Sequence, residues 1–507
     1  MKYPIGIQTF AKIIDTGCVY IDKTKSIEKL MNSGGQIYFL SRPRRFGKSL
    51  LLSTLSSLFQ GKKDLFKGLY IEDKIEWKSY PVAHLSLNTV GILDDLEQGL
   101  HTIMEMAADK YEVKLMRTSV GDKLKELIEK LAKIGPVVLL IDEYDKPLIS
   151  QIEHPEMLEK HRVILKSFYG VIKDLDDYLK FVFITGVSRF ARVSLFSDLN
   201  NLTDISMHED FCDICGYSES DMHHYFTEPI AKIAAGMNIS TPELFEKVRK
   251  KYNGYNFYGK ERMYNPWSVL NFLYSRQLDN FWFESGTPTF LTQIVANFQT
   301  SIEGIVAEKS DLGKLSFDSN NLVPLLYQTG YLTIDEEIEA GLFTLRFPNE
   351  EVSESFTHYL LTEYAHLQQG SVRYVAIKVR NALKAKDKDL LVSALNPIFA
   401  SIPYQIFNKD KEVYYHSVMH LVFMLLHYNI ASEVSTNVGR IDTILLEQNE
   451  IWIFEFKLDS SAEEAFAQII QKDYAGQYRN AGKVIYGVGV NFNSETKKID
   501  EAKMEVL

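Results

Sequence analysis

The chain has 507 residues, of which 46% are hydrophobic and 24% charged, the composition of an ordinary globular protein. This length gives roughly three domains at about 150 residues each, and the composition excludes a disordered, collagen-like or coiled-coil chain. A net charge of −11, from 56 basic and 67 acidic residues, excludes a surface that is basic throughout. Any contact with a polyanion must therefore come from a local basic surface or a metal site.

The three cysteines exclude a disulfide framework and indicate a reducing compartment. Cys212 and Cys215 form a C-x-x-C pair, but structural zinc needs four ligands and the sequence has no second cysteine pair, so we expect two core residues. Ser218 and Asp221 have the spacing of a helix capping box just after them. The N-terminus lacks the apolar stretch of a signal peptide, and no apolar run approaches about 18 residues, so we expect a cytoplasmic protein without a membrane span.

Residues 1–205 alternate between short apolar runs and amphipathic stretches. Strands are expected at 37–40, 84–87, 137–141 and 181–184. Strand–helix alternation with nearly continuous apolar strands predicts an α/β domain whose parallel sheet is covered by helices on both faces. Residues 206–345 predict a helical middle region, with a winged-helix-like arrangement as one option. Residues 346–507 predict a helical lead-in, with helices at 356–367, 376–385 and 418–426, and a mixed α/β domain whose core spans about 410–495.

Residues 41–49 (SRPRRFGKS) lie between the first strand and a helix. The ending Gly47-Lys48-Ser49 is typical of a phosphate-binding loop, in which backbone N–H groups at a helix N-terminus hold phosphates. Lys48 is expected to reach the β- and γ-phosphates, and the Ser49 hydroxyl to ligate Mg²⁺. Arg42 stands where the standard pattern has its first glycine, which is a departure from that pattern.

Two further strand ends complete the predicted nucleotide site. The apolar run 137–141 ends in Asp142 and Glu143, and a buried strand tolerates charges only where water or a cation meets them. We expect Asp142 to hold Mg²⁺ and Glu143 to polarise the attacking water. After the strand at 181–184, Thr185 or Ser188 could sense the γ-phosphate, and Arg189 or Arg192 could add positive charge.

A second constellation lies near the C-terminus. Residues 439–446 and 451–457 predict two strands joined by a tight turn at 447–450, which places Asp442 near the Glu455 end. Side chains alternate along a strand, so Glu455 and Lys457 share one face. Asp442 and Glu455 could bind Mg²⁺, Lys457 could orient water, and Glu433 is an extra candidate ligand. The alternative interpretation is a salt-bridged, solvent-exposed strand.

The segments 19–24, 42–49, 141–145 and 184–190 together resemble the bacterial AAA-ATPase-like family, whose members often carry a C-terminal PD-(D/E)xK nuclease domain. The resemblance implies an ATP- and Mg²⁺-dependent protein, and arginine at position 42 is normal in that family. The expected nucleotide-binding residues are Arg44, Arg45, Phe46, Gly47, Lys48, Ser49, Asp142, Thr185 and Arg189. Gln468, Lys472 and Tyr474 resemble the Gln-x-x-x-Lys-x-Tyr helix of the nuclease superfamily.

The leading hypothesis is an ATP-binding and ATP-hydrolysing protein with a Mg²⁺-dependent nuclease domain that acts on DNA or RNA. Two alternatives stay open: a nucleotide-switched signalling or scaffold protein with an inactive nuclease fold, and a nucleic-acid-binding protein with neither activity. The sequence leaves the type of nucleic acid and homo-oligomer formation open. His416 and His420 are expected to pack in a helix because no acidic partner is evident, and Trp267 to lie in the core with its neighbouring tyrosines.

Overall fold

The fold was analysed in a computed structural model of the whole chain, in which two compact units are distinguished: Met1–Ser285 with Glu303–Glu351, and Gly286–Ile302 with Val352–Leu507. The structure describes residues 1–88, 90, 95–152, 154–189, 195–196, 199, 201–258, 261–282, 305–312, 323–365, 369–400, 412–426, 429–436 and 439–507. No helix within these residues is long and apolar enough to cross a membrane.

The first unit is built on a five-stranded parallel sheet in the order β2-β3-β4-β1-β5. Its strands are β1 (Ile37–Ser41), β2 (Val82–Ser86), β3 (Val137–Asp142), β4 (Leu179–Gly186) and β5 (Leu202–Asp204). The flanking helices are α1 (Phe10–Asp15), α2 (Thr24–Asn32), α3 (Lys48–Phe59), α4 (Leu96–Asp109), α5 (Val120–Leu131), α6 (Lys146–Ile149) and α7 (Pro155–Gly170).

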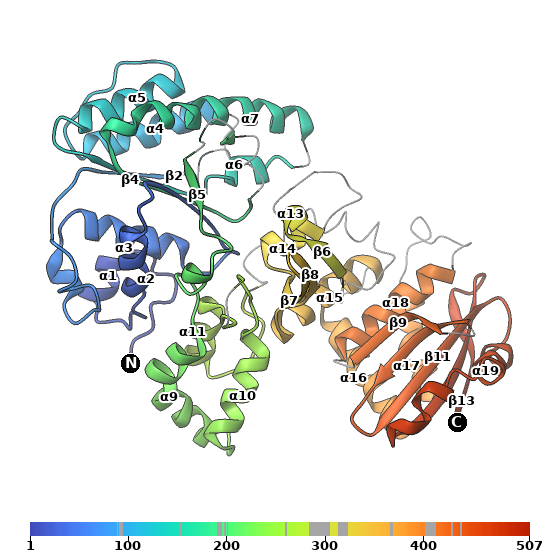
Figure 1. The fold of residues 1–507 in the computed structure, drawn as a ribbon. Helices are drawn as coiled ribbons and strands as arrows, with labels where there is room; N and C mark the ends of the chain where they lie inside the picture. Colours follow the sequence, from blue (N-terminus) through green and yellow to red (C-terminus); the bar gives the residue numbers. More distant parts are fainter. Residues whose placement is uncertain are drawn as a thin grey trace. The chain divides into compact units, whose positions relative to one another are not determined.

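Helices cover both faces of this sheet, as Figure 1 shows for α1–α3 on one side and α4, α5 and α7 on the other. Alternate strand residues explain the arrangement, because Phe39 and Ile141 pack into the α4/α5/α7 core while Leu40 and Leu140 pack against α3. The predicted doubly covered parallel sheet is therefore confirmed. The short edge strand β5 has no counterpart in the sequence-based prediction.

The middle of the chain contains α9 (Glu219–Gly236), α10 (Thr241–Tyr252) and α11 (Pro266–Ser275), which share one apolar core. α9 begins with the predicted capping box, in which Ser218 and Asp221 each accept from the other's backbone N–H. α13 (Lys309–Leu312), α14 (Val323–Thr329) and an antiparallel sheet of β6 (Ile305–Glu308), β8 (Leu342–Arg346) and β7 (Thr333–Glu339) follow. This small sheet was not predicted.

The second unit is built on a mixed sheet in the order β13-β12-β11-β10-β9. Its strands are β9 (Asn429–Thr436), β10 (Gly439–Leu446), β11 (Glu450–Leu458), β12 (Val484–Asn493) and β13 (Lys498–Val506). Its helices are α15 (Glu350–Ala365), which starts in the first unit, α16 (Gln369–Ala385), α17 (Lys388–Ala400), α18 (Glu412–Leu425) and α19 (Ala462–Gln471).

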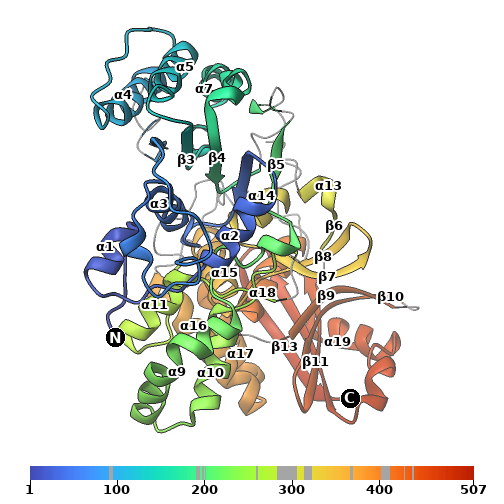
Figure 2. The same cartoon turned by 60° about the vertical axis from the view of Figure 1, so that its left-hand side comes forward.

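The two faces of β11 meet different helices, and Figure 2 gives a second view of this sheet with α19 and α17 on opposite sides. Ile451 and Ile453 pack with Phe466 of α19, whereas Phe454 packs against Phe423 of α18. The hairpin predicted at 447–450 is confirmed, with β10 and β11 antiparallel and Glu447 N–H donating to the Glu450 carbonyl at 2.9 Å. The exposed-strand alternative is wrong for β11, because six of its nine residues are buried.

Candidate functional sites

The loop 41–49 ends at Gly47, which is the N-cap of α3 and lies in the left-handed region with φ +91°. A residue without a Cβ adopts this conformation at no steric cost, so Gly47 lets the chain turn directly into the helix. Lys48, the first residue of α3, folds its ammonium back and donates to the Arg42 carbonyl at 2.8 Å and the Pro43 carbonyl at 2.9 Å. Burial lowers the pKa of Lys48, and the nearby Asp142 carboxylate opposes this shift.

Arg42, in the position of the missing first glycine, is a buried anchor for the loop. Its guanidinium donates to the carbonyls of Ser206 at 2.8 Å and Phe211 at 3.1 Å, and it stacks 4.0 Å from the centre of the Phe257 ring. Its φ is not positive, so the loop path does not require glycine there. Phe46 adds a second anchor, with its buried ring edge-on to Tyr255 and Phe257.

The end of β3 places two carboxylates beside this loop. Asp142 is buried, and its Oδ1 accepts a hydrogen bond of 2.7 Å from the Thr185 hydroxyl at the end of β4. Glu143 follows in the left-handed region with φ 53°, a conformation that is costly for a non-glycine residue and turns the chain out of the strand. Burial raises the pKa of Glu143, while Lys48 lowers it.

Asp145 is a member of the site that residue-by-residue reasoning did not single out. Its buried carboxylate accepts from the backbone N–H of Val187 at 3.1 Å and Ser188 at 2.6 Å, and from the Ser188 hydroxyl at 2.6 Å. It therefore fixes the loop after β4 against the loop after β3. The Ser188 hydroxyl is engaged by Asp145. The only sign of Asp145 in the sequence was the acidic pattern at 142–145.

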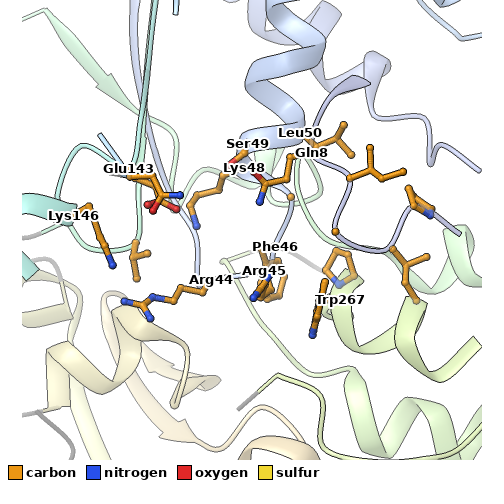
Figure 3. Close-up of a pocket in the computed structure, with 18 of the residues that line it drawn as sticks. Gln8, Arg44, Arg45, Phe46, Lys48, Ser49, Leu50, Glu143, Lys146 and Trp267 are labelled. Carbon is orange, nitrogen blue, oxygen red and sulfur yellow. The ribbon is translucent and has the colours of Figure 1, made fainter. Parts of the chain in front are cut away.

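These elements enclose a cavity of about 320 Å³ (Figure 3). Lys48, Ser49 and Glu143 line one part of it, and Figure 3 shows them converging from the start of α3 and the end of β3. The Arg45 guanidinium lies over the Trp267 ring, 4.2 Å from its centre, in another part. Other lining residues include Ile7, Gln8, Arg44, Phe46, Gly47, Lys146 and Leu270. Trp267, expected in the core, is therefore a wall of the cavity.

Arg189 does not line this cavity. Its guanidinium forms an ion pair with Asp204 of β5, with a 3.1 Å contact from Nε, and its backbone N–H donates to Gln328. It lines a separate, small cavity behind the loop with Arg42 and Pro43. Arg192 lies outside the described residues.

In the second unit, Asp442 and Glu455 occupy neighbouring strands at the point where their pairing ends. The last paired residues of β10 and β11 are Thr443 and Phe454, so Asp442 and Glu455 are the next opposed positions. Phe456 N–H donates to Asp442 Oδ2 at 2.8 Å. Both carboxyl groups are buried, and burial raises the pKa of Asp442.

A hydrogen-bonded network surrounds these two carboxyl groups. Lys457 Nζ lies 3.4 Å from Glu455 Oε1, and the Gln468 amide of α19 donates to the same oxygen. The Tyr474 hydroxyl donates to the Arg440 carbonyl at 2.8 Å and lies 3.4 Å from the Gln468 amide. Four of the residues singled out by sequence therefore converge with Asp442, whereas Lys472 is exposed at the end of α19.

His416 was assigned to helix packing for want of an acidic partner, and that reason is wrong. Its Nε2 lies 3.8 Å from Asp442 Oδ2 and its ring packs 5.0 Å from Phe456. His420 is half-buried, and desolvation lowers its pKa to about 4. The side chain of Glu433 lies outside the described residues.

The side chains expected to hold Mg²⁺ offer oxygen atoms, the ligand type that this ion takes: Ser49 and Asp142 in the first unit, Asp442 and Glu455 in the second. In the described part of the chain no three His, Cys, Asp or Glu side chains form a metal-binding group. Mg²⁺ keeps several waters and commonly uses one or two carboxylates, so these donor pairs fit it and do not fit structural zinc. Cys212 and Cys215 are free thiols.

Comparison with known proteins shows which families the chain resembles. A family model described as "Predicted AAA-ATPase" matches residues 4–196, and one described as "PD-(D/E)XK nuclease superfamily" matches residues 410–502. A protein of Azotobacter chroococcum mcd 1, described as "Uncharacterized protein in vnfD 5'region", is 35% identical over 516 residues, which cover 98% of each chain. The chain belongs to the AAA-ATPase-like family.

The two matched ranges of this AAA-ATPase-like protein contain the two sites. The loop 41–49 and the end of β3 lie within 4–196, and Asp442, Glu455 and Gln468 lie within 410–502. The families indicate a nucleotide-binding domain joined to a nuclease-like domain in one chain.

Proposed function

We propose that the protein binds and hydrolyses ATP in the cavity of the first unit and cleaves nucleic-acid phosphodiesters at the Asp442–Glu455–Lys457 site of the second. The observation that carries the first half is the meeting of Gly47, Lys48 and Ser49 with Glu143 around one cavity. These two groups are about 95 positions apart in the sequence, and their meeting around one cavity supports a phosphate-binding site.

The triphosphate would lie along the start of α3, where backbone N–H groups and the Lys48 ammonium supply positive charge. Lys48 already points into the loop, and its two bonds to loop carbonyls hold it there until a phosphate replaces them. Arg44, Arg45, Phe46 and Gly47 of the same loop also line the cavity, and the first two carry cationic side chains. The base would occupy the part walled by Trp267 and by the Arg45 guanidinium that lies over its ring, since both offer planar surfaces for stacking.

Ser49 and Asp142 would hold Mg²⁺, which neutralises charge on the β- and γ-phosphates when bound. Thr185 would keep the Asp142 carboxylate oriented, a role supported by its 2.7 Å hydrogen bond to Asp142 Oδ1. Glu143 would accept a hydrogen bond from the attacking water and orient it. Its burial raises its pKa, and a carboxyl group with a raised pKa is a better proton acceptor near neutral pH.

In the second unit, Asp442 and Glu455 would hold Mg²⁺, whose chemistry is to lower the pKa of a bound water and to offset charge on the scissile phosphate. The side chain of Lys457 is 28% exposed, and it would donate to the phosphate or to the nucleophilic water. The Gln468 amide would hold the Glu455 carboxylate in a fixed orientation, so that its oxygen atoms are already placed for metal binding.

ATP hydrolysis is tested by phosphate release from purified full-length protein with Mg²⁺, for the wild type and the variants Lys48→Ala and Glu143→Gln. Lys48→Ala should lose nucleotide binding, whereas Glu143→Gln should bind ATP and lose turnover. Lys62→Ala, on a lysine away from the cavity lining, is the control. Turnover by Glu143→Gln at the wild-type rate contradicts the role of Glu143.

Nuclease activity is tested with labelled single- and double-stranded DNA and RNA in the presence of Mg²⁺ or Mn²⁺, with and without ATP. Cleavage should disappear in Asp442→Asn and Lys457→Ala and persist in Lys498→Ala, which alters an exposed lysine of β13. Cleavage that persists in Lys457→Ala refutes this assignment. Absence of cleavage on every substrate, together with intact ATP binding, favours the nucleotide-switched protein with an inactive nuclease fold.

A further inference from the structure

One carboxylate joins the helix that leads out of the first unit to the walls of the nucleotide cavity. Glu351 lies in the first turn of α15, is the last residue of the first unit, and is fully buried. Its carboxylate accepts three hydrogen bonds: 2.7 Å from the Ser268 hydroxyl, 2.6 Å from Phe281 N–H and 2.9 Å from Trp282 N–H. Buried hydrogen bonds to a charged acceptor are among the stronger ones in proteins.

The partners of Glu351 lead directly to the phosphate-binding loop. The indole N–H of Trp282 donates to the Arg44 carbonyl at 3.2 Å, and Arg44 lines the cavity. Ser268 follows the cavity wall Trp267 on α11, and the Trp267 indole donates to the Phe281 carbonyl at 3.1 Å. The segment 281–282 is therefore fixed between the Glu351 carboxylate on one side and two parts of the cavity wall on the other.

Nucleotide binding is expected to change the conformation of the loop 41–49, to which Trp282 is hydrogen-bonded. Lys48 donates to two carbonyls of this same loop, and a phosphate that takes over its ammonium must break or rearrange those bonds. A rearrangement of the loop would move the Arg44 carbonyl that accepts from the Trp282 indole. Because the Trp282 backbone N–H donates to Glu351, this movement would also change the hydrogen bonding of Glu351. Because coupling between two sites is reciprocal, weakening this connection must also change nucleotide affinity.

We propose that Glu351, acting through Trp282, is a positioning residue for the phosphate-binding loop and couples nucleotide occupancy to the first turns of α15. The inference rests on the proposed nucleotide binding and adds the route by which the first unit signals it. α15 continues into the second unit, so its start is one of the covalent connections between the two units.

Trp282→Phe is the sharpest test, because it removes the indole N–H and keeps an aromatic ring against Tyr331. The matched control is Trp77→Phe, since the Trp77 indole donates to the Glu72 carbonyl at 2.8 Å outside the cavity lining. Full-length variants are titrated with a non-hydrolysable ATP analogue by calorimetry at pH 8. Trp282→Phe should weaken affinity about fivefold, the effect of one neutral hydrogen bond, and Trp77→Phe should not.

Hydrogen exchange of the first two turns of α15, with and without the analogue, measures the coupling itself. The analogue should change exchange in the wild type and in Trp77→Phe, and this change should shrink by at least half in Trp282→Phe and in Glu351→Gln. A purely structural role would lower stability in both tryptophan variants without altering the nucleotide-dependent difference.

The outcomes separate this inference from the function on which it rests. If the wild type binds no analogue, the proposed ATP site is wrong. If the wild type binds and Lys48→Ala does not, but Trp282→Phe and Glu351→Gln match Trp77→Phe in affinity and in exchange, the Glu351 connection alone is overturned.

Discussion

Glu351 also makes the stability of the first unit depend on pH in a direction that can be worked out. Burial raises the pKa of its carboxyl group from 4.5 to about 7, opposed by hydrogen bonds from Ser268, Phe281 and Trp282 and by the charge of Lys251. The folded chain therefore binds this proton more tightly than the unfolded chain. The resulting stabilisation is complete below pH 4.5 and is lost as the pH rises through 7.

The magnitude follows from the two pKa values. Their difference of about 2.5 units corresponds to about 3 kcal/mol at 1.36 kcal/mol per unit. Glu351→Gln cannot titrate, so the stability of the wild type relative to this variant should fall by about 3 kcal/mol between pH 4.5 and pH 8. Glu143 and Asp145, whose pKa values burial also raises, are present in both proteins and cancel in the comparison.

Urea unfolding followed by tryptophan fluorescence at intervals of half a pH unit measures this difference. Three of the four tryptophans, Trp77, Trp267 and Trp282, belong to the first unit, so the signal reports mainly on it. The steepest divergence should lie between pH 5 and pH 7, with at most about 1.4 kcal/mol per pH unit for one proton. Wild-type and Glu351→Gln curves that stay parallel over the whole range refute the buried, titrating carboxyl group.

Three further perturbations test the site and the second unit. Trp267→Ala should weaken ATP affinity about tenfold through loss of a stacking surface worth roughly 1–3 kcal/mol, and unchanged affinity in calorimetry would place the base elsewhere. Thr185→Val should lower kcat about tenfold with little change in KM, because the lost hydrogen bond orients Asp142, and an equal rise in KM would argue against that role. Gly489→Ala should destabilise the second unit by about 1–3 kcal/mol, since its Cβ would meet the backbone of α19 at 2.5 Å. Gly170→Ala, with open space around it, is the control in thermal unfolding, and equal melting temperatures would contradict the close packing of α19 on β12.

Local patterns in the sequence predicted the four longer strands of the parallel sheet, the loop at 41–49 and the hairpin of β10 and β11, but not β5 or the small sheet of β6, β7 and β8. The apolar run 137–141, the ending Gly47-Lys48-Ser49 and the hairpin turn at 447–450 depend on neighbours within a few residues, so periodicity and turn chemistry predict them. Pairing of Asp442 with Glu455 follows from counting along a hairpin. The family resemblance pointed to Gln468 and Tyr474 because their spacing on one segment is local as well.

Contacts between distant segments were decided only by the tertiary structure. In the sequence, Arg42 is only a departure from the glycine pattern of the loop. The structure shows that its guanidinium donates to the carbonyls of Ser206 and Phe211, more than 160 positions away. Arg189 meets Asp204 on a strand that the apolar pattern did not reveal, and His416 meets Asp442 across 26 positions. Glu351 and Trp282 lie 69 positions apart. A buried polar side chain takes whichever partner the packed chain brings to it, and its own sequence neighbourhood carries no record of that partner.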